Sequence, residues 1–153
     1  MKILATFLLV LLAGVSCFQW GPTNLNCLKQ LNLSKETIDE VYQPWSKPSP
    51  EYNEILNDFL ECSWKNSGNL NSNGEIVWDK IDEALSMGAK EHMENSKTDF
   101  EKANVVFTTR MIKMAYNSCQ EEQIEGDTPG QKVVKIQNCV TDWLQTFKSS
   151  YQG

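Results

Sequence analysis

The feature that most constrains this fold is a set of four cysteines spread along a chain of 153 residues: Cys27, Cys62, Cys119 and Cys139. No two of them are close enough in sequence to form the C-x2-C pairs of a structural zinc site. An even number of widely spaced cysteines is typical of a secreted protein with two disulfides, and the three ways of pairing them are all open at this point. The cysteines therefore predict a small domain held by covalent links, with no metal ion.

The first 17 residues have the pattern of a removable secretion signal. Lys2 supplies positive charge, and residues 3–15 form an apolar run that is short for a bilayer span. Cleavage after Cys17 is preferred because it removes a fifth cysteine, and cleavage after Ser16 is the alternative. We therefore expect residues 1–17 to be a signal peptide and residues 18–153 to be one domain of a secreted, extracellular protein without membrane insertion.

The charge of the chain excludes some partners. Acidic side chains outnumber basic ones by 20 to 14, for a formal net charge of −6. Such a chain repels a phosphate backbone, so we expect no nucleic-acid partner. With 41% hydrophobic and 22% charged residues, the composition is that of a globular domain. Asn32 begins an Asn-Leu-Ser sequon, which makes it a candidate N-glycosylation site.

Prolines, glycines and capping residues divide the chain into segments of helical periodicity and leave almost nothing for a sheet. We expect a helix over 26–31, a second over 35–42 that is capped by Ser34, and a third from Pro50 to Cys62 that is capped by Ser49. A fourth helix is expected around 77–88. The last two are expected from a capping box of Ser96 and Asp99 to Cys119, and from Thr128 and Pro129 to Phe147. In the third of these, Tyr52, Ile55, Leu56, Phe59 and Cys62 are expected on one face. The fold class is therefore all-α: a compact bundle of five to seven short helices with two disulfides.

The apolar side chains suggest an internal cavity. Short amphipathic helices do not easily fill an interior of this size, so we expect an apolar cavity between them. A stripe of aromatic residues and methionines is more often core than binding site, but Met111 and Met114 lie close to Phe107 on one helix, and flexible thioethers suit a cavity that adapts to its ligand. Tyr116 or Tyr151 would orient that ligand. The expected lining residues are Phe59, Trp78, Phe107, Met111, Met114, Tyr116, Trp143, Phe147 and Tyr151.

Catalysis finds no support in the sequence. His92 is the single histidine, and no nucleophile motif, metal-histidine pair or phosphate loop accompanies it. Residues 69–76 resemble the start of a calcium loop, but the first three ligand positions are asparagines and the twelfth position is Lys80 in place of the bidentate glutamate. We therefore expect neither an enzyme nor a cofactor.

One segment carries a resemblance to a known family. After Cys62 the chain continues with a basic residue, a glycine, an apolar residue, a polar turn, a second glycine and an isoleucine: Lys65, Gly68, Leu70, residues 71–73, Gly74 and Ile76. This segment resembles the insect odorant-binding and pheromone-binding proteins, and the order of the four cysteines is similar to the frame of that family. The resemblance implies bridges Cys27–Cys62 and Cys119–Cys139, and a secreted carrier of small, mostly hydrophobic odorants or pheromones.

The chain departs from the usual family pattern in two ways. Most members have six cysteines, and the two missing ones correspond to Asp58 and Gly130, so the chain resembles the four-cysteine ("C-minus") type. The resemblance implies that these two positions face each other. The 56 residues between Cys62 and Cys119 are also more than is usual, which indicates an extension around 87–97. The alternatives are a salivary relative that scavenges host amines or lipid mediators, and a secreted helical signalling or inhibitor protein; a homodimer is left open.

Overall fold

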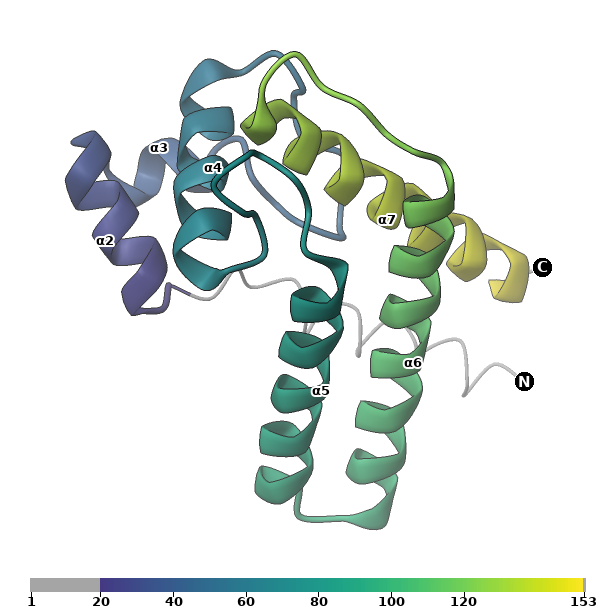
Figure 1. Ribbon diagram of the computed structural model, residues 1–153. Helices are drawn as coiled ribbons and strands as arrows, with labels where there is room; N and C mark the ends of the chain where they lie inside the picture. Colours follow the sequence, from purple (N-terminus) through teal and green to yellow (C-terminus); the bar gives the residue numbers. More distant parts are fainter. Residues whose placement is uncertain (1–19, 153) are drawn as a thin grey trace.

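The computed structural model describes residues 20–152, and the signal peptide expected over 1–17 lies outside them. The described range contains six helices and no strand, apart from an isolated antiparallel bridge between Leu70 and Ile76 (Figure 1). The helices are α2 (Pro22–Leu31), α3 (Lys35–Asp39), α4 (Glu54–Ser67), α5 (Trp78–Asn95), α6 (Asp99–Glu121) and α7 (Pro129–Gln152). The all-α expectation is confirmed.

Two of the expected helix starts are confirmed by their capping bonds. The Ser34 hydroxyl accepts a hydrogen bond from the backbone N–H of Thr37 at 3.3 Å and so caps α3. The Thr128 hydroxyl accepts from the N–H of Gln131 at 3.1 Å at the start of α7. Helix α2 begins earlier than expected, at Pro22, because proline fits the first helical turn without loss of a hydrogen bond.

The expected start at Ser49 and Pro50 is wrong. Ser49 is instead buried, where its N–H donates to Asn138 Oδ1 at 2.7 Å and its carbonyl accepts from Asn138 Nδ2 at 2.9 Å. This pair of bonds from α7 holds the chain in a non-helical path, and α4 begins only at Glu54, capped by Asn53. As a consequence Tyr52 precedes the helix and is 78% exposed.

The predicted faces and caps need two further corrections. Ile55 is 46% exposed, because the buried side of α4 follows Leu56, Phe59 and Leu60. Helix α6 is capped by Thr98, with Glu101 completing the capping box, so the expected box of Ser96 and Asp99 is wrong.

Most of the core lies in a part that we call the body: helices α2, α3, α4 and α7, together with α6 from Met111 onward. Helix α4 packs against α2 and α7, and α7 packs against α6. The fully buried side chains of the body come from all five of these helices, and the large ones include Ile38, Leu56, Phe59, Leu60, Val133, Ile136 and Val140.

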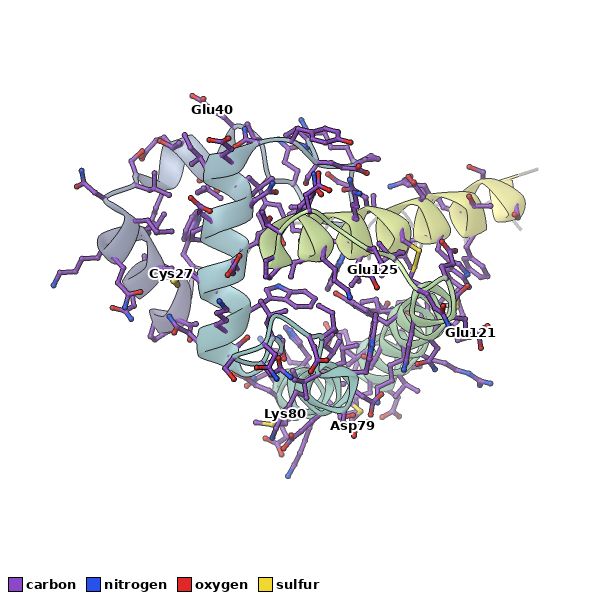
Figure 2. The ribbon with its side chains drawn as sticks, turned by 45° about the horizontal axis from the view of Figure 1, so that its top comes forward. Cys27, Glu40, Asp79, Lys80, Glu121 and Glu125 are labelled. Carbon is purple, nitrogen blue, oxygen red and sulfur yellow. A yellow bond between two sulfur atoms is a disulfide. The ribbon has the colours of Figure 1, made fainter. Side chains whose placement is uncertain are left out.

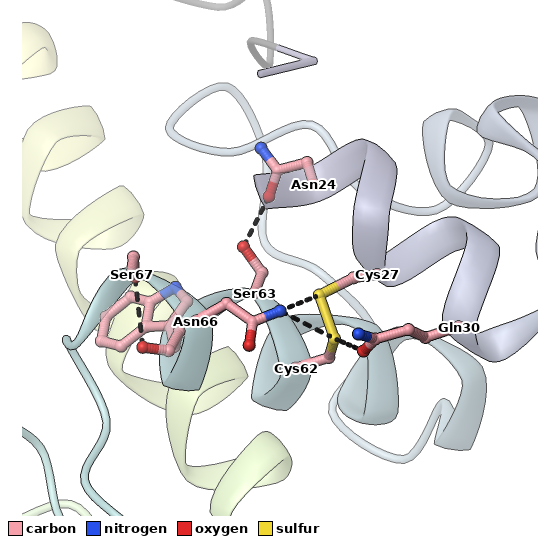
Figure 3. The surroundings of a disulfide bond; sticks show 8 residues. Asn24, Cys27, Gln30, Cys62, Ser63, Asn66 and Ser67 are labelled. Carbon is pink, nitrogen blue, oxygen red and sulfur yellow. Dashed lines mark hydrogen bonds between the residues drawn. A yellow bond between two sulfur atoms is a disulfide. The ribbon is translucent and has the colours of Figure 1, made fainter. Parts of the chain in front are cut away.

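Both disulfides lie in the body, with the pairing that the family resemblance implied. Cys27–Cys62 joins α2 to α4, and Cys119–Cys139 joins α6 to α7. Around the first bridge, Asn66 Nδ2 donates to Cys27 Sγ at 3.2 Å, and Ser63 Oγ donates to Asn24 Oδ1 at 2.5 Å (Figure 3). The body is thus closed by one covalent link on each side of the α4–α7 contact.

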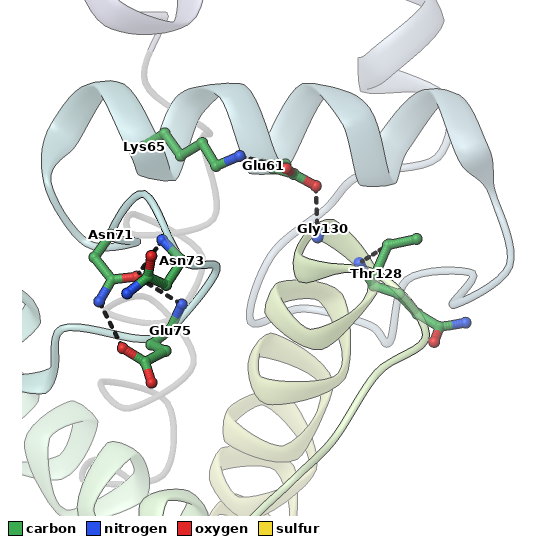
Figure 4. A network of polar contacts seen from close by, with 8 residues as sticks. Glu61, Lys65, Asn71, Asn73, Glu75, Thr128 and Gly130 are labelled. Atoms are coloured by element: carbon green, nitrogen blue, oxygen red, sulfur yellow. Dashed lines mark hydrogen bonds and ion pairs between the residues drawn. The ribbon is translucent and has the colours of Figure 1, made fainter.

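Gly130 lies directly against α4, as the six-cysteine pattern implied. Its N–H donates to Glu61 Oε2 at 3.1 Å, and that glutamate also pairs with Lys65 (Figure 4). A Cβ at position 130 would overlap the carbonyl of Asn57, one residue before Asp58. The two positions are therefore neighbours, but this packing has no room for a side chain at 130.

Helices α5 and α6 form a long antiparallel hairpin that projects from the body (Figure 1). We call residues 82–110 the arm, because no residue in this range is buried. Burial resumes at Ile81 on α5 and at Met111 on α6, where the arm joins the body. The extension expected around 87–97 is therefore additional helix with its connecting turn.

Candidate ligand-binding site

A wide groove lies between α5 and α6, mostly on the arm, and reaches the start of the body at Lys113, Met114 and Asn117. It has a volume of about 440 Å³ and is open to solvent along its length. Apolar side chains from both helices line it, and polar and basic groups complete its walls: Ser86, Ala89, Val106, Thr109, Arg110, Lys113, Met114 and Asn117. This volume falls within the range of small-molecule sites in proteins, which is roughly 300–1,000 Å³.

A smaller hollow continues the groove toward the body. Its volume of about 20 Å³ is enough for roughly one water molecule. Trp78, Ile81 and Leu85 contribute its apolar walls, and it shares Lys113 and Asn117 with the wide groove. The two hollows therefore adjoin each other along the contact of α5 with α6, and we refer to them together as the depression.

The charges of the groove come from two basic residues on α6. Lys113 is engaged: its Nζ lies 2.8 Å from Asp82 Oδ1 and donates to Ser86 Oγ at 2.7 Å, so it links α6 to α5. Arg110 lies one turn earlier and makes no ion pair with any residue that the structure describes. By contrast, the labelled charges of the body, such as Glu40 and Glu121, lie at its periphery (Figure 2).

Three of the nine expected lining residues lie at the depression. Trp78 and Tyr116 line the small hollow, and Met114 lines the wide groove. Met114 is 46% exposed. Phe107, on the same helix, is 41% exposed but lies outside the lining of the groove. Exposed apolar side chains of this size are available to an incoming ligand rather than committed to the core.

The other expected lining residues lie elsewhere. Phe59 is fully buried in the body, with its ring centroid 5.8 Å from that of Trp20, and Met111 is buried where α6 meets the body. Trp143 and Phe147 stack on each other along α7, with centroids 5.8 Å apart and planes 2° apart. The side chain of Tyr151 is outside the described residues. The structure does not bring these residues to the groove, and their contact with a ligand stays a prediction.

Tyr116 connects the depression to the core. Its side chain is buried, and this burial raises the pKa of the Tyr116 hydroxyl to about 12. Burial, with the nearby Tyr116 as a second cause, also raises the pKa of Tyr42 well above its ordinary value. Both hydroxyls therefore stay neutral at ordinary pH and can donate hydrogen bonds. The sequence patterns did not identify Tyr42, Arg110 or Lys113 as site residues. For Arg110 there was a usable signal, since it is the single arginine beside thirteen lysines.

The loop that resembled a calcium site is a closed polar turn. Asn71 Oδ1 accepts from the N–H groups of Asn73 and Glu75, each at 2.9 Å, and Asn71 Nδ2 donates to Glu75 Oε2 at 2.8 Å (Figure 4). Gly74 has the positive φ that this turn requires, and Leu70 is buried beneath it. No group of three or more His, Cys, Asp or Glu side chains in residues 20–152 is arranged to hold a metal ion. The motif serves to connect α4 to α5.

Comparison with protein families gives one match for this chain. The model of the PBP/GOBP family matches residues 20–142, which include all the described helices except the end of α7. The chain belongs to the PBP/GOBP family. Proteins of the PBP/GOBP family bind small molecules and do not act as enzymes. A search of curated proteins and a search of solved structures found no match.

Within the described residues of this PBP/GOBP protein, no helix is both long enough and apolar enough to cross a bilayer. Asn32, the candidate glycosylation site, is exposed at the C-terminal end of α2 with φ 51°. Its modification stays a prediction.

Proposed function

We propose that this protein is a secreted carrier of the four-cysteine type that reversibly binds a small, mostly hydrophobic molecule between α5 and α6, without chemical change to it. The observation that carries this proposal is the wide groove of about 440 Å³ with Val106, Ala89 and Met114 in its walls. Family membership supports a small ligand, and the odorant or pheromone class is the one that we propose.

The energetics favour apolar ligands with a flexible fit. Each 100 Å² of apolar surface that leaves water contributes about 2.5 kcal/mol before the cost of association. No residue of the arm is buried, so its two helices are held by fewer buried contacts than those of the body. Such a segment adjusts at lower cost than a closed core. A groove with Met114 in its wall can therefore accommodate ligands of more than one shape.

The experiment is a titration with the apolar fluorescent probe N-phenyl-1-naphthylamine. We expect binding of one probe per chain, and release when a competing apolar ligand is added. Ala89→Trp places a large side chain in the groove and should weaken probe binding at least tenfold. Ala84→Trp is the matched control, since Ala84 is exposed on the same helix and does not line the groove.

Two outcomes would count against this site. Failure of the folded wild-type protein to bind the probe would favour a protein that acts through its surface, such as a helical signalling protein. Equal binding by the Ala89→Trp and wild-type proteins would place the ligand elsewhere in the fold. Scavenging of host amines is disfavoured because Arg110, whose charge no ion pair in the described residues offsets, lines the groove and repels a cationic ligand.

A further inference from the structure

We propose that the ligand of this groove is a single-chain amphiphile with a carboxylate head, such as a long-chain fatty acid, and that Arg110 binds the head. This inference rests on the proposed function and specifies the class of its ligand. The juxtaposition that carries it is a guanidinium without an ion pair in the wall of an apolar groove.

Arg110 is unusual in this chain. It is the single arginine among 14 basic residues, and the other 13 are lysines. It lies on α6 four residues after Val106 and four before Met114, so all three occupy one face of the helix, and all three line the groove. A guanidinium is charged at every physiological pH and can bind a carboxylate through two parallel hydrogen bonds. The groove thus presents one point for an anionic head between two apolar surfaces.

The other cation in the groove is already neutralised. Lys113 pairs with Asp82 at 2.8 Å and also donates to Ser86. Arg110 makes no ion pair within residues 20–152, although the whole chain carries 20 acidic side chains. An acidic protein that leaves its one arginine without a carboxylate partner retains a local site for an anion from solution. The net charge of −6 of the chain disfavours anions elsewhere on the protein, so Arg110 is the position in the groove where a carboxylate gains a favourable charge interaction.

The dimensions of the groove fit the rest of such a molecule. Val106, Ala89 and Met114 supply apolar contacts for an acyl chain, and Thr109, the residue before Arg110, supplies a polar group near the head. A volume of about 440 Å³ accommodates a single chain. The groove is open to solvent, so the carboxylate keeps part of its hydration while the chain leaves water.

The test compares a fluorescent fatty acid with its uncharged ester. The dissociation constants of cis-parinaric acid and of its methyl ester are measured for the wild-type protein, Arg110→Gln and Lys102→Gln. Lys102 is the matched control, since it is an exposed cation on α6 that does not line the groove. We expect Arg110→Gln to weaken binding of the acid about tenfold, which corresponds to about 1.4 kcal/mol, and to change binding of the ester less than twofold. Lys102→Gln should change neither, and added salt should weaken binding of the acid only.

The outcomes separate this inference from the function on which it rests. If the wild-type protein binds neither the acid nor the ester, the proposed function at this groove is wrong. If it binds both equally and Arg110→Gln has no effect, the groove is a carrier site and the proposed head-group recognition is overturned. Binding of the acid that survives Arg110→Gln but is lost in Lys113→Gln would overturn the assignment to Arg110. Binding that weakens as protein concentration rises would show that a second copy occupies the groove, which also overturns the proposal.

Discussion

The body and the arm are built from helices of similar composition but reach opposite degrees of burial. In the body, α4 is in contact with both α2 and α7, and its side chains Leu56, Phe59 and Leu60 are almost completely removed from water. In the arm, α5 packs against α6, and large side chains such as Met87 and Phe100 are 65% and 52% exposed. Helical periodicity is therefore insufficient to make a core, because each apolar face also needs a second element to cover it.

The difference bears directly on function. The free energy that keeps a protein folded is unevenly distributed, and segments with few buried contacts open and adjust first. Both disulfides and nearly all fully buried side chains lie in the body, whereas most of the wide groove lies on the arm. The body supplies stability, and the arm is free to present apolar surface to a ligand.

The largest expected effect comes from making one substitution in both regions. Phe59→Ala removes a fully buried ring from the body and should lower the free energy of unfolding by about 3–5 kcal/mol. Phe107→Ala removes a ring of the arm that is already 41% exposed, so we expect a change within about 0.5 kcal/mol. Urea denaturation measures both. Similar losses for the two variants would contradict the division of the molecule into a body and an arm.

The next largest effect concerns the bridge at the base of the arm. Replacing Cys119 and Cys139 together by alanine opens a link of sequence separation 20 and should cost roughly 3 kcal/mol in the chain-entropy model. Because this bridge fixes α6 to α7, hydrogen exchange of α5 should also become faster. The control is the corresponding double substitution at Cys27 and Cys62, which have a sequence separation of 35, and it should cost roughly 4 kcal/mol. In this control the hydrogen exchange of α5 should speed up no more than that of the rest of the protein. Equal effects of the two double substitutions on the exchange of α5 would contradict the idea that the Cys119–Cys139 bridge steadies the arm through α6.

Much of the body could be predicted from the sequence because its signals are local. Ser34 and Thr128 cap helices through bonds to residues three positions later, which a sequence displays directly. Ser49 has the same local signal, yet its partner is Asn138, 89 positions away on α7. A long-range hydrogen bond of this kind overrides a local propensity and cannot be found from spacing alone.

The candidate site was harder to predict, for a different reason. Met114 was expected to contact the ligand and lies in the groove, because its chemistry singles it out on an apolar stripe. Arg110 was missed, because a cation on a helix is usually a solvated charge and its place in the groove depends on how α5 packs beside α6. Phe59 and Trp143 share the periodicity of Met114 but lie on helices that other elements cover. Periodicity identified the apolar residues, and only tertiary packing separated core from groove.

The smallest expected effect tests the junction between the two regions, at Tyr116. Burial of the side chain raises the pKa of its hydroxyl to about 12 in the folded protein, from the ordinary value of about 10 for tyrosine. The unfolded chain therefore loses this proton first as the pH rises above about 10, so stability that is fully present below that pH declines between about pH 10 and 12. At pH 11 the loss from this group should be roughly 1 kcal/mol. We expect Tyr116→Phe to reduce the loss of unfolding free energy between pH 9 and 11 relative to the wild-type protein, as followed by urea denaturation at each pH.

Tyr52→Phe is the control for Tyr116→Phe, since the Tyr52 side chain is 78% exposed and the effect requires burial. Identical pH dependence for the wild-type and Tyr116→Phe proteins would mean that water reaches Tyr116 in solution, so that the opening along α5 and α6 extends further into the body than the small hollow beside Trp78.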